Sequence, residues 1–269
     1  MARPNLSYLK NTVLVVVGVP CGLLTGLTGM TNSYLVAPLL SWLIGLRDAR
    51  LIGSALAVAS FSSLTGILAY AQQGVLDWSL IVVVGLGFLV GAAFGQRAGS
   101  VPAARVGGAV LGIALGAAMI VVAHLSAPWH ALAAGAFRSA WWPAAALVLG
   151  IATGLAGRVL DLAGLLIVPA LYYVAGASML AAQACALAIL LVNSIPAAIT
   201  YAQRSLTEVR SAVWMSFGAL LGALGGSQAT AAHHQDHQMT IIYAIAMICL
   251  IVIRQLSNPT SAPPAGTAQ

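Results

Sequence analysis

The feature that most constrains this chain is an internal repeat, because its two halves align without a gap when the sequence is shifted by 131 residues. The shift superimposes Pro38 on Pro169 and the tripeptide Tyr-Ala-Gln at 70–72 on its copy at 201–203. It also superimposes two glycine ladders with four-residue spacing, namely Gly87, Gly91, Gly95 and Gly218, Gly222, Gly226. Chance matching of Ala and Leu does not produce these coincidences in one register. The sequence therefore predicts two copies of one fold.

Both copies consist of long apolar runs, and these runs determine the class of protein. Of the 269 residues, 61% are apolar and only 6% are charged, whereas a soluble domain has about 25% charged residues. A soluble globular protein and a disordered chain are both excluded. The runs do not alternate in the way that a membrane β-barrel requires. The eleven basic residues form no basic stripe, so no nucleic-acid partner is expected. The predicted fold class is an all-α polytopic membrane protein.

Each half opens with an apolar stretch that is interrupted in its middle. The first runs from about Asn11 to Gly45 and the second from about Trp142 to Gly176. As one helix such a stretch is about 50 Å long, against a bilayer core of about 30 Å. The interruptions are marked by Gly26, Thr28, Gly29, Thr31, Asn32 and Ser33, and by Gly157, Arg158 and Asp161. Three spans of about 20 residues follow in each half. They are predicted at about 51–72, 78–96 and 106–124, and at about 178–201, 209–226 and 239–253.

The basic residues favour folding each interrupted stretch back as a hairpin. With hairpins, nine basic residues are cytoplasmic and only Arg138 is external, which fits the positive-inside rule. A single crossing gives a split of six to four instead. The hairpins give each half an odd number of crossings, so the two repeats are inverted and both termini are cytoplasmic. The expected organisation is a cytoplasmic N-terminus at 1–10, a first repeat at 11–124, an external linker at 125–141, a second repeat at 142–254 and a disordered tail at 255–269.

The two breaks predict one central binding site. Irregular backbone at membrane depth is tolerated only where it is buried in protein or lines a cavity, and the freed N–H groups favour an anion. Polar residues in the spans that follow add hydroxyl and amide groups, although such residues also serve to satisfy a broken helix or to bond neighbouring backbone. The candidate substrate-binding residues are Thr28, Gly29, Thr31, Asn32, Ser33, Ser54, Gly157, Arg158 and Asn193.

Arg158 is the most informative of these residues, because a charge at membrane depth costs at least about 2.5–3.5 kcal/mol. Asp161 follows three positions later, so the two share a helical face and can pair. One interpretation is a structural ion pair that braces the break. The other is an anion ligand at Arg158, with Asp161 carrying a coupling proton. The aligned positions of the first half are Leu27 and Met30, so either role makes the site asymmetric.

No enzyme motif is present, since the chain lacks GxSxG, Walker A and HExxH patterns. No cofactor or metal is expected. The three cysteines, Cys21, Cys185 and Cys249, all lie within apolar stretches and are interpreted as small core residues.

The duplicated break motifs resemble the TauE/SafE sulfite-exporter family. The copies are GLLTGLTGMTNSYLVAPLLSWLIGL at 22–46 and GIATGLAGRVLDLAGLLIVPALYYVAG at 150–176, and GSAL at 53–56 is similar to a downstream family element. Where the family has a glycine cluster, this chain has Gly29-Met30-Thr31-Asn32-Ser33. The resemblance implies a multi-pass inner-membrane carrier of sulfite, organosulfonates or related organic acids, commonly an exporter. Its partners would be a small anionic substrate and the lipid bilayer. An anion channel, a non-transporting scaffold subunit and a homo-oligomer stay open as alternatives.

Overall fold

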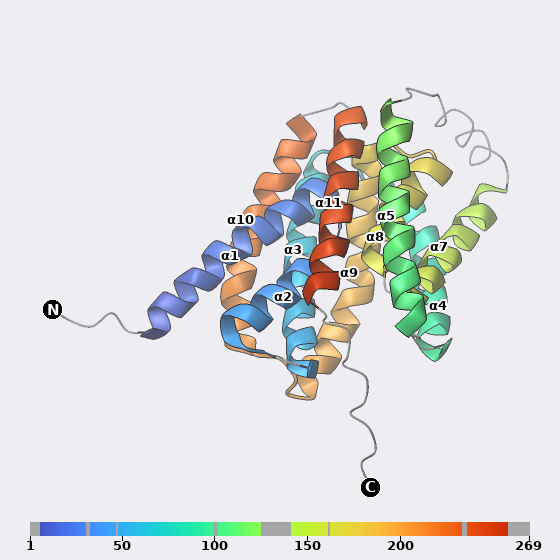
Figure 1. Cartoon of the computed structure of the whole chain (residues 1–269). Coiled ribbons are helices and arrows are strands. Elements are labelled where there is room, and N and C mark those ends of the chain that lie inside the picture. The colour runs from blue at the N-terminus through green and yellow to red at the C-terminus, as the bar shows by residue number, and fades with distance from the viewer. Residues whose placement is uncertain are drawn as a thin grey trace, which may run out of the picture.

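The computed structural model is a bundle of helices (Figure 1), and within the residues it describes there is no strand. The described residues are 6–30, 33–46, 48–98, 102–124, 141–160, 162–232 and 236–257. The helices of the first half are α1 (Leu6–Thr28), α2 (Ser33–Ile44), α3 (Asp48–Gln72), α4 (Trp78–Ala98) and α5 (Pro102–His124). Those of the second half are α7 (Trp142–Val159), α8 (Ala163–Pro169) with the π-helix η1 (Ala170–Val174), α9 (Met179–Gln203), α10 (Val209–Ala232) and α11 (Asp236–Ser257).

The helix boundaries follow the sequence repeat closely. Shifting α3 by 131 residues gives the bounds of α9, and the last residues of α1 and α7, Thr28 and Val159, are also 131 positions apart. The order in each half is therefore a broken stretch followed by three longer helices. Most of these helices exceed the predicted spans by a few residues; α11, for example, begins at Asp236 rather than near residue 239. The predicted linker and C-terminal tail fall almost entirely outside the described residues.

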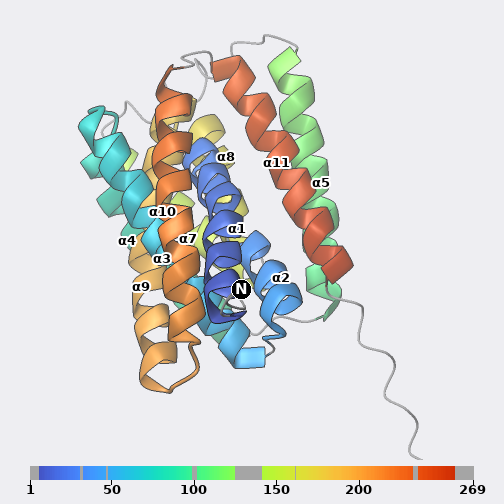
Figure 2. The same cartoon turned by 90° about the vertical axis from the view of Figure 1, so that its left-hand side faces the viewer.

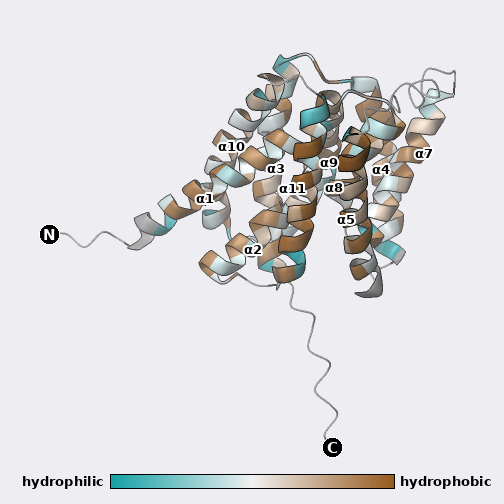
Figure 3. Cartoon of the chain, turned by 45° about the horizontal axis from the view of Figure 1, so that its top comes forward, coloured by the Kyte–Doolittle hydropathy of each residue, from teal (hydrophilic) through white to brown (hydrophobic). Residues whose placement is uncertain are grey.

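Seven of the described helices are long and apolar enough to cross a membrane: α1, α3, α4, α5, α7, α9 and α11. Many large apolar side chains are exposed on the outside of the bundle, among them Trp42, Phe94 and Phe217, and apolar residues occur along the helices (Figure 3), as expected for helices in contact with lipid. Helix α10 is not among the seven. Its buried residues include Ser216, Ser227 and Thr230 beside glycines, and it packs on α1 and α3. The predicted all-α polytopic membrane fold is confirmed.

The glycine ladders bring helices of opposite halves into backbone contact. A Cβ added at Gly22 would overlap the carbonyl oxygen of Ala219, and one added at Gly91 would overlap that of Ile151. Gly22 lies on α1 and Ala219 on α10, while Gly91 lies on α4 and Ile151 on α7. The residue numbers of the contacting positions increase together along the two helices of each pair. Helix α1 therefore runs parallel to α10, and α4 runs parallel to α7. The glycine ladders are therefore packing faces that allow two helix backbones to approach closely.

Helices α3 and α9 cross in the middle of the bundle and run antiparallel. Gly53 at the start of α3 packs against Tyr201 at the end of α9, and Gly66 packs against Leu187. Between them, the hydroxyl of Ser60 donates a hydrogen bond to the Oγ of Ser194 at 3.1 Å. Helices α5 and α11 are antiparallel too, because Gly112 meets Ile251 and Gly116 meets Ile248.

Both ends of the first broken stretch lie at the same end of the bundle. Helix α1 starts where α10 starts, since the two are parallel, and Gly53 near the start of α3 packs against Leu206 just before α10. Helix α2 ends next to the start of α3 and therefore returns to that end, as Figure 2 shows. We call this end the basic end, since the helix ends gathered there carry Lys10, Arg50, Arg97, Arg204, Arg210 and Arg254. By the same reasoning α7 starts and η1 ends at the opposite end, where α9 begins.

The structure corrects the position of both breaks. Gly26, Thr28, Gly157 and Arg158 were expected within the breaks but lie in the last turns of α1 and α7. Gly26 is required for packing instead, because a Cβ there would overlap the carbonyl oxygen of Ala223 on α10. Helix α1 ends at Thr28, because the φ of +68° at the following Gly29 lies outside the helical region.

Candidate functional site

The first break is held by its own threonine. The hydroxyl of Thr28 donates to the carbonyl oxygen of Leu24 at 2.6 Å, and its oxygen accepts from the backbone N–H of Met30 at 3.3 Å. Thr28 is fully buried. Its hydroxyl thus satisfies backbone on both sides of the break, which is the structural role that the sequence left open. Thr31 and Asn32 lie outside the described residues, and Ser33 is the first residue of α2.

The carbonyl oxygen of Gly26 is bound by two side chains from other helices. Tyr70 of α3 donates its hydroxyl at 2.6 Å, and Thr230 of α10 approaches at 3.5 Å. Tyr70 is fully buried. Because these bonds connect the end of α1 to α3 and α10, they fix the position of the first break.

Tyr70→Phe is expected to destabilise the protein by about 1–3 kcal/mol, since it leaves a buried carbonyl without its short hydrogen bond. Thermal unfolding in detergent measures the effect. Tyr201→Phe is the control, because Tyr201 is the repeat counterpart of Tyr70 and is only half-buried. Equal unfolding temperatures for Tyr70→Phe and the wild type would contradict the assigned hydrogen bond.

Gln183 of α9 lies directly against the first break. Its Cα is 2.6 Å, and its Cβ 2.8 Å, from the position that a Cβ on Gly29 would occupy. The side chain is 0% exposed, yet neither Nε2 nor Oε1 has a hydrogen-bond partner among the described residues. A buried donor or acceptor left unpaired costs about 1–3 kcal/mol. Gln183 was not among the predicted site residues, although a glutamine in an otherwise apolar span was the available signal.

The second break lies between the end of α7 at Val159 and the start of α8 at Ala163. Arg158 precedes it and packs against α4, where its Cβ is 2.7 Å from the position of a Cβ on Gly95. The side chain is half-buried, and its Nε is buried without a hydrogen-bond partner among the described residues. Within the same ranges, no hydrogen bond joins Arg158 to the first break. Asp161 lies outside the described residues, so its pairing with Arg158 stays a prediction.

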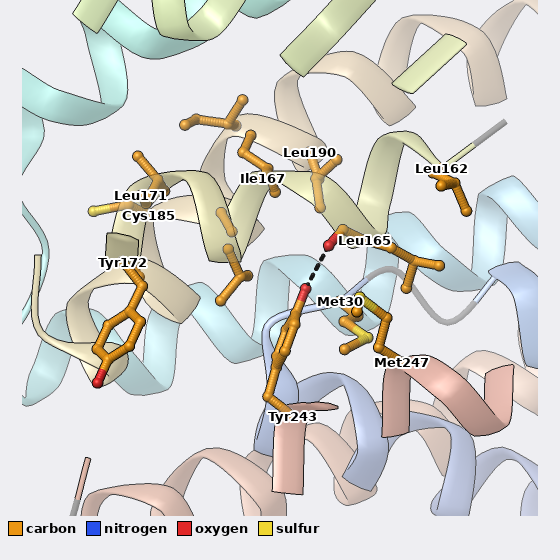
Figure 4. Close-up of a cluster of buried hydrophobic side chains, with 14 of the residues drawn as sticks. Met30, Leu162, Leu165, Ile167, Leu171, Tyr172, Cys185, Leu190, Tyr243 and Met247 are labelled. Carbon is orange, nitrogen blue, oxygen red and sulfur yellow. Dashed lines mark hydrogen bonds between the residues drawn. The ribbon is translucent and has the colours of Figure 1, made fainter. Parts of the chain in front are cut away.

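The start of α8 packs in a buried apolar cluster that also contains the first break (Figure 4). Tyr243 of α11 donates its hydroxyl to the carbonyl oxygen of Leu165 at 2.8 Å. Met30, from the first break, belongs to the same cluster as Leu162 and Leu165. The cluster therefore connects residues next to the two breaks through the interior of the bundle.

The family of the chain follows from a comparison over nearly its whole length. The model of the sulfite exporter TauE/SafE family matches residues 14–254, which include both breaks and most of α1. The chain belongs to the TauE/SafE family. Members of this family are membrane transporters of the sulfite- or sulfonate-exporter type. Searches among curated proteins and among solved structures gave no match.

The crossing of α3 and α9 gathers further polar residues of this TauE/SafE protein. Ser62 and Ser63 are fully buried, and Ser63 has no hydrogen-bond partner among the described residues. Their repeat counterparts are Asn193, which is half-buried, and Ser194, which accepts from Ser60. The Ser60–Ser194 hydrogen bond places this part of α9 at its crossing with α3. Asn193 precedes Ser194 on α9 of this TauE/SafE protein, and it is half-buried.

Ser54 lies elsewhere in the bundle. Its hydroxyl donates to the carbonyl oxygen of Arg50 at 2.8 Å and accepts from the backbone N–H of Glu208 at 2.9 Å. It therefore joins the starts of α3 and α10 at the basic end. Gln183 and Tyr201 lie near opposite ends of α9, about 27 Å apart along the helix, so Ser54 is far from the first break. The geometry gives Ser54 a structural contact and does not bring it to the other candidates.

Proposed function

We propose that this TauE/SafE protein is a secondary transporter of small oxyanions, namely sulfite, organosulfonates or related organic acids, and that it acts as an exporter. The observation that carries the proposal is that unpaired buried polar groups adjoin both helix breaks. Gln183 contributes an amide at the first break and Arg158 a guanidinium Nε at the second. Such groups are costly in an apolar bundle unless a ligand satisfies them. Oxyanions accept several hydrogen bonds at once and suit both donors.

The substrate would bind between the two hairpins. Gly29 and Ser33 border the first break, and Gly157 and Arg158 precede the second. Thr31, Asn32 and Asp161 complete the proposed set from the sequence, with Asp161 in the coupling role. Asn193, at the α3–α9 crossing, would lie on the path between the hairpins. This arrangement of broken helices around a shared site is the one that many secondary transporters use.

An inverted repeat is part of the proposal. It is supported by the direction of the helices that correspond in the two halves, since α3 is antiparallel to α9 and α5 is antiparallel to α11. The basic end would face the cytoplasm of a cell whose inner membrane holds the protein. Both termini would then be cytoplasmic, and the repeats would extend over 11–124 and 142–254. An odd number of crossings in each half accounts for all of these features.

A thermal-unfolding screen tests the proposed function. Sulfite, thiosulfate, sulfonates and small carboxylates are added to the purified protein in detergent. A true substrate present at 100 times its Kd is expected to stabilise the folded state by about 2.7 kcal/mol. Chloride and a cationic amine serve as controls for ionic strength. Stabilisation by no oxyanion in the series would contradict the proposal.

A further inference from the structure

Gln183 differs from the other buried polar residues near the first break. Thr25 and Thr28 donate to backbone carbonyls one turn earlier in α1, and Tyr70 and Thr230 donate to Gly26. All four of these side chains therefore have a structural partner. The amide of Gln183 is equally buried, but neither its Nε2 nor its Oε1 has a hydrogen-bond partner among the described residues.

Gln183 lies against the first break and is buried inside the bundle rather than exposed to lipid. Its Cα, Cβ and carbonyl oxygen all lie within 2.8 Å of the position that a Cβ on Gly29, the residue after α1, would occupy. Nearby on α9, Cys185 contacts the carbonyl oxygen of Asp77 through its Sγ at 3.9 Å, and Met179 donates its backbone N–H to Asp236 at 3.3 Å. These two groups of α9 therefore have hydrogen-bond partners, whereas the amide of Gln183 has none among the described residues.

The chemistry of an amide restricts what can satisfy it. Its NH₂ group donates two hydrogen bonds and its oxygen accepts. An anion that has only acceptor oxygens, such as an alkylsulfonate, can satisfy Nε2 but leaves Oε1 unpaired. An oxyanion that also carries an O–H or N–H group can satisfy both ends. Sites built to bind a substrate hydroxyl discriminate strongly against the analogue that lacks it.

We propose that Gln183 binds the transported oxyanion through both ends of its amide and so selects anions that carry a hydrogen-bond donor of their own. Hydrogensulfite, hydroxyalkylsulfonates and hydroxycarboxylates have this chemistry. The inference rests on the proposed anion-transport function and specifies its substrate class. Gly29 supports this role because a residue with a side chain there would collide with Gln183 and push it away from the break.

Two matched pairs of probes test this selectivity: 2-hydroxyethanesulfonate with ethanesulfonate, and hydroxyacetate with acetate. Binding to the purified full-length protein is measured by thermal shift and isothermal calorimetry. The wild type is expected to bind at least one hydroxylated probe about tenfold more tightly than its partner, which corresponds to one additional good hydrogen bond. In Gln183→Met the two members of that pair are expected to bind with similar affinity. Gln203→Met, on the exposed final turn of the same helix, is expected to keep the wild-type preference.

The unliganded variant separates a ligand role from a structural one. Met fills a similar volume without polar atoms, so removing an unpaired amide should leave the unfolding temperature unchanged or raise it. A clear fall in that temperature, or failure to fold, would show that the amide has a structural partner and would overturn the proposal. A preference retained in Gln183→Met, or no preference in the wild type, would also overturn it. If the wild type binds none of the four probes and no hydrogensulfite, the proposed anion-transport function itself is contradicted, whatever the Gln183 variants show.

Discussion

Gly22→Leu is expected to prevent α1 from docking on α10 and to destabilise the protein by about 3 kcal/mol or more. A Cβ at Gly22 would overlap the carbonyl oxygen and the Cα of Ala219. These are backbone atoms of a packed helix, so they cannot move aside as the tip of a flexible side chain can. Since α1 carries the first break, its displacement should abolish ligand binding as well. The folded yield and the unfolding temperature in detergent measure the effect.

Gly225→Leu provides the matched control. Gly225 lies on α10 between two ladder glycines, but a Cβ there meets nothing within 4 Å. Replacing an exposed helical glycine with leucine should stabilise the helix by up to about 1 kcal/mol. Two identical substitutions, one in the α1–α10 interface and one on the exposed face of α10, should therefore change stability in opposite directions. Similar unfolding temperatures for the two variants would show that the backbones of α1 and α10 do not approach this closely.

Arg158→Lys is expected to lower transport about 100-fold while the protein still inserts and folds, a loss equivalent to about 2.7 kcal/mol. The substitution retains the positive charge but removes the planar fork that binds an oxyanion through two parallel hydrogen bonds. Flux into proteoliposomes gives the transport rate, and gel filtration confirms folding. Arg97→Lys, at an exposed position in the last turn of α4, is the control and should transport normally.

A structural ion pair with Asp161 leads to a different pattern. Removing one partner of a buried pair costs about 3–5 kcal/mol, because the other charge is left uncompensated. Arg158→Gln would then be unstable, and adding Asp161→Asn would restore both stability and transport. In the proposed role the double variant is stable but inactive. Flux near the wild-type rate in Arg158→Gln/Asp161→Asn would remove Arg158 from the substrate ligands.

Much of the architecture could be predicted because membrane helices are constrained by length and apolarity, and the repeat doubles each signal. Trp78 and Val209 begin α4 and α10 where expected. The breaks were placed a few residues early, since glycine was taken to interrupt the helix. At Gly26 the glycine instead permits contact with the backbone of α10, whereas Gly29 has a positive φ and leaves the helical region. A sequence does not distinguish these two uses of glycine, because the difference depends on the neighbouring helix.

The candidate site was less accessible to sequence reasoning for a similar reason. In a sequence, a polar residue that hydrogen-bonds its own helix backbone cannot be told from one that binds a ligand. Thr28 and Ser54 have structural partners, while Gln183 has none among the described residues. Thr28 finds its partners within four residues, whereas Glu208 beside Ser54 and Gly29 beside Gln183 are more than 100 positions away in the sequence. Helices of one half pack on helices of the other half, α1 on α10 and α4 on α7. The sequence did not predict this packing.

Counterflow in proteoliposomes tests the central claim most directly. Vesicles that contain the purified protein are loaded with sulfite or an unlabelled hydroxylated oxyanion, and uptake of the same labelled anion is followed from outside. We expect saturable uptake that exceeds equilibrium transiently and is stimulated by anion on the opposite side, as a carrier with one alternating site requires. Uptake that increases without saturation and shows no stimulation would indicate a channel. Uptake no greater than in protein-free vesicles, for every oxyanion tested, would contradict the claim that this protein transports small oxyanions.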